Sequence, residues 1–142
     1  MQIQLMKQFC GCARYVYNRT LSLERSLYKK DNKHSFKYAE AANRLPEWKK
    51  KNPFLKECHS QVLQQSLKDL NQAYTNFFRK RANFPKYKKK FRNDSIRFPQ
   101  GVELDEVKQQ IRVPKIGWMG YRKSRDIIGT IKNVTVSRRG EK

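Results

Sequence analysis

Apolar residues recur at intervals of three and four along the first part of the chain. The positions are Leu5, Phe9, Cys12, Ala13, Val16, Leu23 and Leu27, with Thr20 in the same register. This spacing places them on one face of an α-helix, because a helix turns once every 3.6 residues. The pattern predicts a long amphipathic helix over residues 3–29.

A polar stretch at residues 30–35 interrupts this pattern and predicts a turn. Ser35 is a residue type that caps helices, and Pro46 lacks the N–H that a helix interior requires. A short second helix is therefore predicted from Phe36 to about Leu45. Residues 46–58 are rich in lysine and contain a second proline, so they are predicted to form a loop with one helical turn.

The clearest helical pattern begins at Ser60 and continues to about Arg81. Leucines and aromatic residues occupy one side of this segment, and glutamines, lysine and asparagine occupy the other. Its apolar side is expected to pack on the first helix. Short connections between the three helices favour an antiparallel bundle.

The hydrophobic period changes after Asn83. Short segments alternate or are rich in β-branched residues, which predicts antiparallel strands: 95–98, 102–104, 110–113, 115–122 with a bend at its glycines, and 131–138. We therefore predict an α+β chain with a helical domain over residues 1–82. A basic segment and a small β-sheet or partial β-barrel are predicted over residues 83–142.

The charge balance narrows the class of partner. The chain has 142 residues and a net charge of +21, and such an excess is best tolerated when a polyanion neutralises it. DNA or RNA is favoured over a membrane surface, because no lipidation signal, signal peptide or transmembrane stretch is evident. We expect a cytoplasmic protein, with nucleic acid rather than a membrane or a small-molecule substrate as its partner.

The densest basic segment mixes cations with aromatic rings. Its cations are candidates for contact with an RNA or DNA backbone, and its rings could stack on unpaired bases. The cations are Arg79, Lys80, Arg81, Lys86, Lys88, Lys89, Lys90, Arg92 and Arg97, and the rings are Phe84, Tyr87, Phe91 and Phe98. The alternative is a solvated linker whose aromatic residues pack into the core.

The polar side of the third predicted helix is a second candidate site. Gln61, Gln64 and Gln65 lie near its N-terminal end. A glutamine amide can form two hydrogen bonds with an adenine edge, and recognition helices often present their N-terminal residues to DNA. The alternative is the ordinary polar outer face of a bundle.

The sequence contains little that favours metal binding or catalysis. Cys10, Cys12, Cys58 and His59 do not have the spacing of structural zinc ligands, so packed thiols are the favoured interpretation. His34 lies in a polar turn without an evident partner. The aspartates are scattered, and no phosphate-binding or catalytic-triad motif is present. We expect no catalytic residue, no metal site and no cofactor on this chain.

Several ordered motifs resemble the N-terminal part of the TnpB (OrfB) family, insertion-sequence proteins related to type V CRISPR effectors. They are Gly11-Cys-Ala-Arg-Tyr-Val-Tyr-Asn18, Leu63-Gln-Gln-Ser-Leu-Lys-Asp-Leu70, Phe84-Pro-Lys-Tyr-Lys-Lys-Lys90, Phe98-Pro-Gln-Gly101, Val113-Pro-Lys-Ile-Gly-Trp118 and Val134-Thr-Val-Ser-Arg138. The resemblance implies a helical recognition domain inserted into a wedge-like β-barrel, which together hold a guide RNA and contact DNA flanking the target.

The resemblance also implies particular contacts. Tyr38, Gln61, Gln64 and the pair Pro99-Gln100 match positions that touch the flanking DNA in the family. The family's metal-dependent nuclease domain and zinc ribbon would begin after Arg138, so the chain is expected to be truncated and non-catalytic by itself. Two alternatives stay open: a stand-alone helix-turn-helix regulator of DNA, or the unstable product of a decayed transposase gene.

Overall fold

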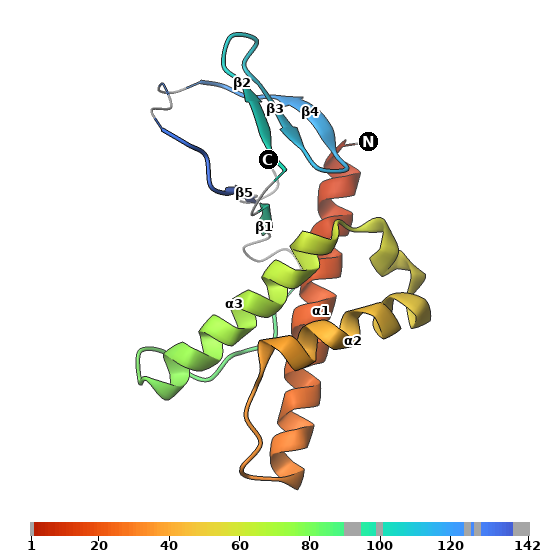
Figure 1. Cartoon of the computed structure of the whole chain (residues 1–142), viewed down its shortest axis with the longest axis vertical. Helices are drawn as coiled ribbons and strands as arrows, with labels where there is room; N and C mark the ends of the chain where they lie inside the picture. Colours follow the sequence, from red (N-terminus) through yellow and green to blue (C-terminus); the bar gives the residue numbers. More distant parts are fainter. Residues whose placement is uncertain (1, 90–94, 99–100, 124–125, 127–128, 138–142) are drawn as a thin grey trace.

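Three helices form one part of the molecule and two small antiparallel sheets form the other, as Figure 1 shows. The computed structural model describes residues 2–89, 95–98, 101–123, 126 and 129–137. The helical elements are α1 (Gln2–Lys30), α2 (Tyr38–Lys51), the 3-10 helix η1 (Pro53–Glu57) and α3 (Ser60–Phe78). The predicted α+β class is confirmed.

Helices α1 and α3 run in the same direction, because contacts further along α1 are made further along α3. In Figure 1, α2 runs across α1. The Ser66 hydroxyl of α3 donates a hydrogen bond to the Ala13 carbonyl of α1 at 2.7 Å. Further along both helices, Tyr17 and Leu21 of α1 share a buried cluster with Leu70 and Tyr74 of α3. The long first helix and the packing of α3 against it are therefore confirmed.

The predicted bounds of the second helix are wrong. Helix α2 begins at Tyr38, after an extended Lys37 that makes no side-chain cap, and it continues through Pro46 to Lys51. Ala41, Leu45 and Trp48 are buried on one face of α2, while Pro46 points to solvent. Burial of this face on both sides of the proline offsets the missing backbone hydrogen bond, so the helix is not terminated there. The predicted helical turn in the following loop is confirmed as η1.

Helix α3 ends at Phe78, three residues before the predicted end. The Arg81 N–H donates to the Asn76 carbonyl at 2.8 Å, and the Lys80 N–H donates to the Phe77 carbonyl at 3.0 Å. This pair of bonds is a Schellman motif, which closes the last carbonyls of a helix. Lys80 occupies the left-handed position of the motif, with φ of 58°. The basic triplet Arg79–Arg81 therefore forms the turn after α3.

The strands form two separate, open sheets. In one sheet, β1 (Ser95–Phe98) pairs with β5 (Val134–Ser137), with Ile96 opposite Val136. In the other, β2 (Glu103–Asp105), β3 (Gln110–Val113) and β4 (Gly117–Gly120) pair in sequence order. All pairings are antiparallel, as predicted, and residues 106–109 form the turn between β2 and β3.

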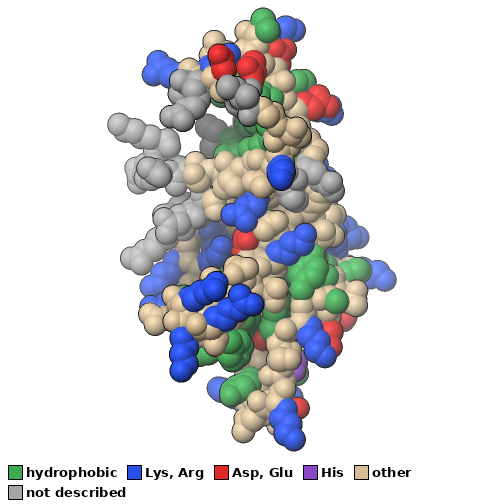
Figure 2. All heavy atoms as spheres, turned by 60° about the vertical axis from the view of Figure 1, so that its left-hand side comes forward, with side chains coloured by type: hydrophobic (Ala, Val, Ile, Leu, Met, Phe, Trp, Pro, Cys, Tyr) green, Lys and Arg blue, Asp and Glu red, His purple; other side chains and the backbone are tan. Residues whose placement is uncertain are grey.

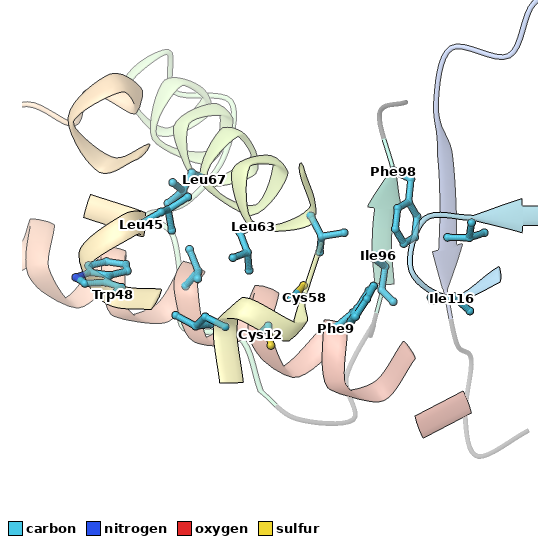
Figure 3. Close-up of a cluster of buried hydrophobic side chains, with 14 of the residues drawn as sticks. Phe9, Cys12, Leu45, Trp48, Cys58, Leu63, Leu67, Ile96, Phe98 and Ile116 are labelled. Carbon is cyan, nitrogen blue, oxygen red and sulfur yellow. The ribbon is translucent and has the colours of Figure 1, made fainter. Parts of the chain in front are cut away.

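One hydrophobic core joins the helices to the strands. Phe9 and Cys12 of α1 belong to the same buried cluster as Ile96 and Phe98 of β1 and Ile116 before β4. Figure 3 shows these side chains converging from both parts of the chain. Strands of three and four residues rarely persist alone, so the small sheets depend on this shared core. The division at residue 83 stays a prediction.

Candidate nucleic-acid interface

The basic segment is docked on α1 by a pair of hydrogen bonds. The Asn18 side-chain amide donates to the Lys88 carbonyl at 2.9 Å, and the Lys88 N–H donates to the Asn18 amide oxygen at 2.7 Å. One asparagine therefore satisfies both backbone groups of Lys88, as a neighbouring strand would. The sequence alone did not single out Asn18, although it ends the first family motif. The segment over residues 84–88 is held in place rather than forming a solvated linker.

A cation of α1 holds the aromatic residues of the same segment. The Arg25 guanidinium lies 5.0 Å from the ring centre of Phe84 and 5.4 Å from that of Tyr87. Hydrogen bonds from Arg25 and Ser22 lower the pKa of Tyr87. Phe84 also packs edge-on against Tyr74 and Phe77 of α3, so the segment contacts both α1 and α3.

The candidate backbone-binding cations differ in their surroundings. Exposed side chains are Arg79, Lys80, Arg81, Lys86, Lys88 and Lys89. The Lys88 ammonium lies 4.6 Å from the ring centre of Tyr17, and the Arg97 guanidinium lies 3.5 Å from the Asp69 carboxylate. Lys90 and Arg92 lie outside the described residues. Figure 2 shows Lys and Arg side chains spread over this face, with hydrophobic side chains among them in the lower half.

The four aromatic residues of the basic segment do not share one role. Phe98 is fully buried in the core, so its ring offers no face to a base. Phe84 is half-buried between α1 and α3, whereas Tyr87 is 44% exposed. Phe91 lies outside the described residues. Of the predicted stacking residues that are described, Tyr87 is the best placed.

The glutamine face of α3 lies beside the N-terminal end of α2. The Lys68 ammonium is 5.8 Å from the Tyr38 ring centre, and Gln64 precedes Lys68 by one helical turn. Tyr38 therefore lies beside Lys68, and the exposed Gln64 is one helical turn away on the same side of α3. Gln65 is engaged by Asp69, to which its amide donates at 3.0 Å. Pro99 and Gln100 lie outside the described residues.

Gln61 begins this face, next to the residue that caps α3. His59 is the N-cap, and its Nδ1 accepts a hydrogen bond from the Gln61 N–H at 3.3 Å. Burial and the nearby Lys115 ammonium lower the pKa of His59, which keeps this nitrogen an acceptor. The Gln61 side-chain oxygen is buried and makes no hydrogen bond within the described part of the chain. A buried carbonyl of this kind is costly unless a partner satisfies it.

A buried carboxylate fixes the turn between α1 and α2. Glu24 is 5% exposed, and its two oxygens contact His34 Nε2 at 2.5 Å and Arg44 Nη1 at 3.1 Å. His34, expected to be a surface residue without a partner, is therefore part of an ion-paired network. The Arg44 guanidinium and the hydrogen bond with His34 compensate the carboxylate, which would otherwise be strongly unfavourable in the interior.

Two of the three thiols pack in the core, the interpretation that the sequence favoured. Cys12 and Cys58 are buried, and the Cys12 thiol lies 3.7 Å from the Phe54 carbonyl. The hydrogen bond with Cys12, together with burial, raises the pKa of the Cys58 thiol. These thiols connect α1 to the segment before α3 by packing.

Several carboxylates outside the core are engaged with cations or turns. Asp126 contacts the Lys123 ammonium at 2.6 Å, and Glu103 contacts Arg112 at 3.4 Å. Asp31 and Asp105 accept hydrogen bonds from backbone N–H groups in turns. Among the described residues, no group of three or more His, Cys, Asp or Glu side chains is placed to hold a metal ion.

Two hollows adjoin along the exposed side of α1. One, of about 770 Å³, lies beside Trp48, where the Arg19 guanidinium is 5.2 Å from the Trp48 ring. The other, of about 740 Å³, lies between α1, α3 and the docked basic segment. Both are lined by Ser22 and Ser26, so they form one groove along α1. No described helix is long and apolar enough to cross a membrane.

Comparisons with known proteins agree with this arrangement. A family model described as a helix-turn-helix domain, of the OrfB type, matches residues 1–33. The chain is 50% identical over 134 residues, 93% of its length, to "Putative RNA-guided DNA endonuclease InsQ" of Escherichia coli (strain K12), of which it covers 33%. It is 43% identical over 81 residues, 55% of its length, to a "Putative RNA-guided DNA endonuclease" of Streptomyces pristinaespiralis, of which it covers 20%.

Fold, surface charge and these similarities define a basic α+β protein related to RNA-guided DNA endonucleases. The resemblance of the chain to the N-terminal part of the TnpB (OrfB) family, inferred from its motifs, is confirmed. The chain spans 33% of the length of the first of these relatives.

Proposed function

We propose that this chain is a nucleic-acid-binding part of a TnpB-like protein, which holds a guide-like RNA and contacts DNA flanking the target. One observation carries the proposal. A basic segment is docked on α1 through Asn18, and the side chains of Lys86 and Lys89 are exposed beside it. The chain has a net charge of +21, and the contacts that hold residues 84–88 on α1 present their cations to phosphates as a fixed surface.

The glutamine face of α3 supplies the proposed DNA contact. Gln64 is exposed one helical turn from Lys68, which lies beside Tyr38, and the buried Gln61 oxygen lacks a partner within the described residues. If the Gln61 side-chain amide rotated outwards, it could form hydrogen bonds with the edge of a base.

We further propose that the chain binds nucleic acid without cutting it and that it acts in the cytoplasm.

Salt-dependent binding tests the proposal. The chain is titrated with the transcript of its own genomic region, with random RNA and with duplex DNA at several salt concentrations. Replacing Lys86, Lys88 and Lys89 together by glutamine should lower the slope of log affinity against log salt by about 2 to 3, because each phosphate contact contributes about 0.7–0.9. An unchanged slope would show that the basic segment does not bind phosphate.

A matched control separates position from charge. Lys50, Lys56 and Lys108 are exposed and lie in α2, η1 and the β2–β3 turn, away from the docked segment. Replacing these three by glutamine removes the same charge and should change the slope less. Duplex binding that needs no RNA would instead favour the helix-turn-helix regulator, the function suggested by the model matching residues 1–33. Metal-dependent cleavage by the purified chain would contradict the proposal of binding without cutting.

A further inference from the structure

The C-terminal end of α3 carries a ladder of aromatic rings with one exposed end. Phe36 stacks on Tyr74 with ring centres 5.4 Å apart, and Tyr74 stacks on Phe78 with centres 6.4 Å apart. The planes of these neighbours are inclined by 24° and 19°. Phe78 is 68% exposed, so the last ring of the ladder has a face directed away from the core.

The ladder forms one wall of the 740 Å³ hollow between α1, α3 and the docked basic segment. The lining also contains Arg25, whose guanidinium lies over the rings of Phe84 and Tyr87, and the exposed Lys29. The volume lies within the range of about 300–1,000 Å³ that is usual for ligand sites. A large exposed aromatic surface rimmed by charged groups typically marks a binding site.

The polar groups of the hollow also suit a neutral ring with a phosphate attached. Burial raises the pKa of Tyr74 to about 12, so its hydroxyl stays neutral and can donate a hydrogen bond. The Glu24 carboxylate, which would repel a phosphate, is already engaged by His34 and Arg44. Arg25 and Lys29 supply the positive charge at the mouth.

We infer that this hollow binds an unpaired base of a single-stranded nucleic acid, stacked on Phe78, with the adjoining phosphates near Arg25 and Lys29. The inference rests on the proposed function and specifies where a single strand meets the protein. A base paired within a duplex cannot extend this stack, because both of its faces are already covered. The adjoining hollow beside Arg19 continues the path of the strand along α1.

A substitution at Phe78 tests the inference with little risk to folding, since this side chain is mostly exposed. Phe78→Leu keeps an apolar side chain but removes the ring, and Phe78→Trp restores a larger ring. The probe is an oligouridine RNA of about 12 nucleotides, similar to the site sizes of single-strand binding folds. We expect Phe78→Leu to weaken binding by about 5-fold to 150-fold, the effect of losing one base–aromatic stack. Phe78→Trp should bind at least as well as the unchanged chain.

Two comparisons make the result specific. Phe54→Leu removes an exposed ring that packs on Tyr15, outside the hollow, and should leave oligouridine binding unchanged. An abasic strand of the same length keeps the phosphates but has nothing to stack, so Phe78→Leu should not affect its binding. An oligodeoxythymidine arm shows whether RNA or DNA is the preferred source of the base.

The possible failures are distinguishable. If the unchanged chain binds none of the strands in dilute salt, the proposed function fails together with the inference. If it binds them with the expected salt slope but Phe78→Leu has no effect, or weakens the abasic strand equally, only the stacking site is refuted. Concentration-dependent self-association that Phe78→Leu abolishes, with unchanged RNA binding, would show that a second copy covers the hollow and would also overturn the inference.

Discussion

The N-terminal half of α3 exposes amide groups, whereas its C-terminal half exposes aromatic rings. Gln64 lies one helical turn from Lys68, which contacts Tyr38, and Phe78 lies beside the docked basic segment at the other end. Amides can distinguish one base edge from another, while rings and cations accept bases of any sequence. Gln61 and Phe78 are separated by about 25 Å along the axis, at 1.5 Å per residue. One helix thus holds the two proposed binding surfaces at a fixed spacing.

Substitution of Leu67 tests whether the two ends form one body, and it should have the largest effect on stability. Leu67 is fully buried midway along α3, so Leu67→Ala should lower the free energy of unfolding by about 2–5 kcal/mol. Denaturant unfolding followed by Trp fluorescence and by circular dichroism should show one shared transition. Val107→Ala, at a 93% exposed position, should change stability by less than about 0.5 kcal/mol. Two separated transitions for Leu67→Ala would contradict the view that the two ends of α3 form one body, because the ends would then unfold independently.

The neutral Tyr74 phenol makes the aromatic end sensitive to alkali. Its pKa is raised to about 12, mainly by burial, whereas an unfolded tyrosine titrates near 10. The unfolded state therefore loses its proton first, so the stabilisation is complete below about pH 10 and is lost as pH rises towards 12. The loss amounts to about 2–3 kcal/mol, from the shift of about two units. Tyr74→Phe should remove this component from a stability profile between pH 9 and 12.

Tyr28→Phe is the matched control for this measurement, because Tyr28 lines the same hollow but is mostly exposed. Its alkaline profile should follow that of the unchanged chain. Parallel profiles for Tyr74→Phe and the unchanged chain would mean that the Tyr74 hydroxyl is not protected in solution, and the hydrogen-bonding role suggested for it in the hollow would be withdrawn.

Replacement of Gln64 examines the amide end alone. Gln64→Ala should weaken binding to the preferred duplex by about 1–3 kcal/mol and relax the preference for one base, if the amide reads a base edge. Gln72→Ala provides the control on the same helix, since Gln72 is exposed but is held by Asn76 at 2.9 Å. Oligouridine binding should be unchanged in both variants. Equal losses on all duplex sequences would show that Gln64 positions the backbone and reads no base.

The sequence predicted those elements whose hydrophobic period is undisturbed. Helices α1 and α3 and strands β1 and β3 lie within a few residues of their predicted bounds. Helix α2 was cut short in the prediction because Pro46 is a strong local signal, and the burial of Leu45 and Trp48 that overrides it is a tertiary effect. The alternation around Phe98 predicted a strand correctly, but period alone could not show that its ring is buried against Phe9.

The sequence predicted only part of the candidate site, because the rest depends on contacts between distant residues. Composition identified the cations and rings of the basic segment, because charge and aromatic content are local properties. The bonds that hold Asn18 to Lys88 join residues 70 positions apart, and Glu24 meets Arg44 across a turn. Such partners become apparent only when the chain is folded, so the docked conformation of the segment could not be predicted.

The smallest predicted effect concerns the turn that joins the aromatic end to the basic segment. Lys80 adopts a φ of 58°, a region that glycine occupies without steric cost. Both hydrogen bonds of the Schellman motif join backbone groups, so a change of side chain leaves them in place. Lys80→Gly should therefore raise the free energy of unfolding by up to about 1 kcal/mol. It should also lower the salt slope for oligouridine by about 0.7, if the Lys80 ammonium contacts a phosphate. Lys80→Ala removes the same charge without relieving the backbone, so it should show the reduced slope but no gain in stability. If glycine and alanine have the same melting temperature, the left-handed turn is not strained. If neither substitution changes the salt slope, the Lys80 ammonium does not contact a phosphate, and the phosphate-binding cations lie outside this turn.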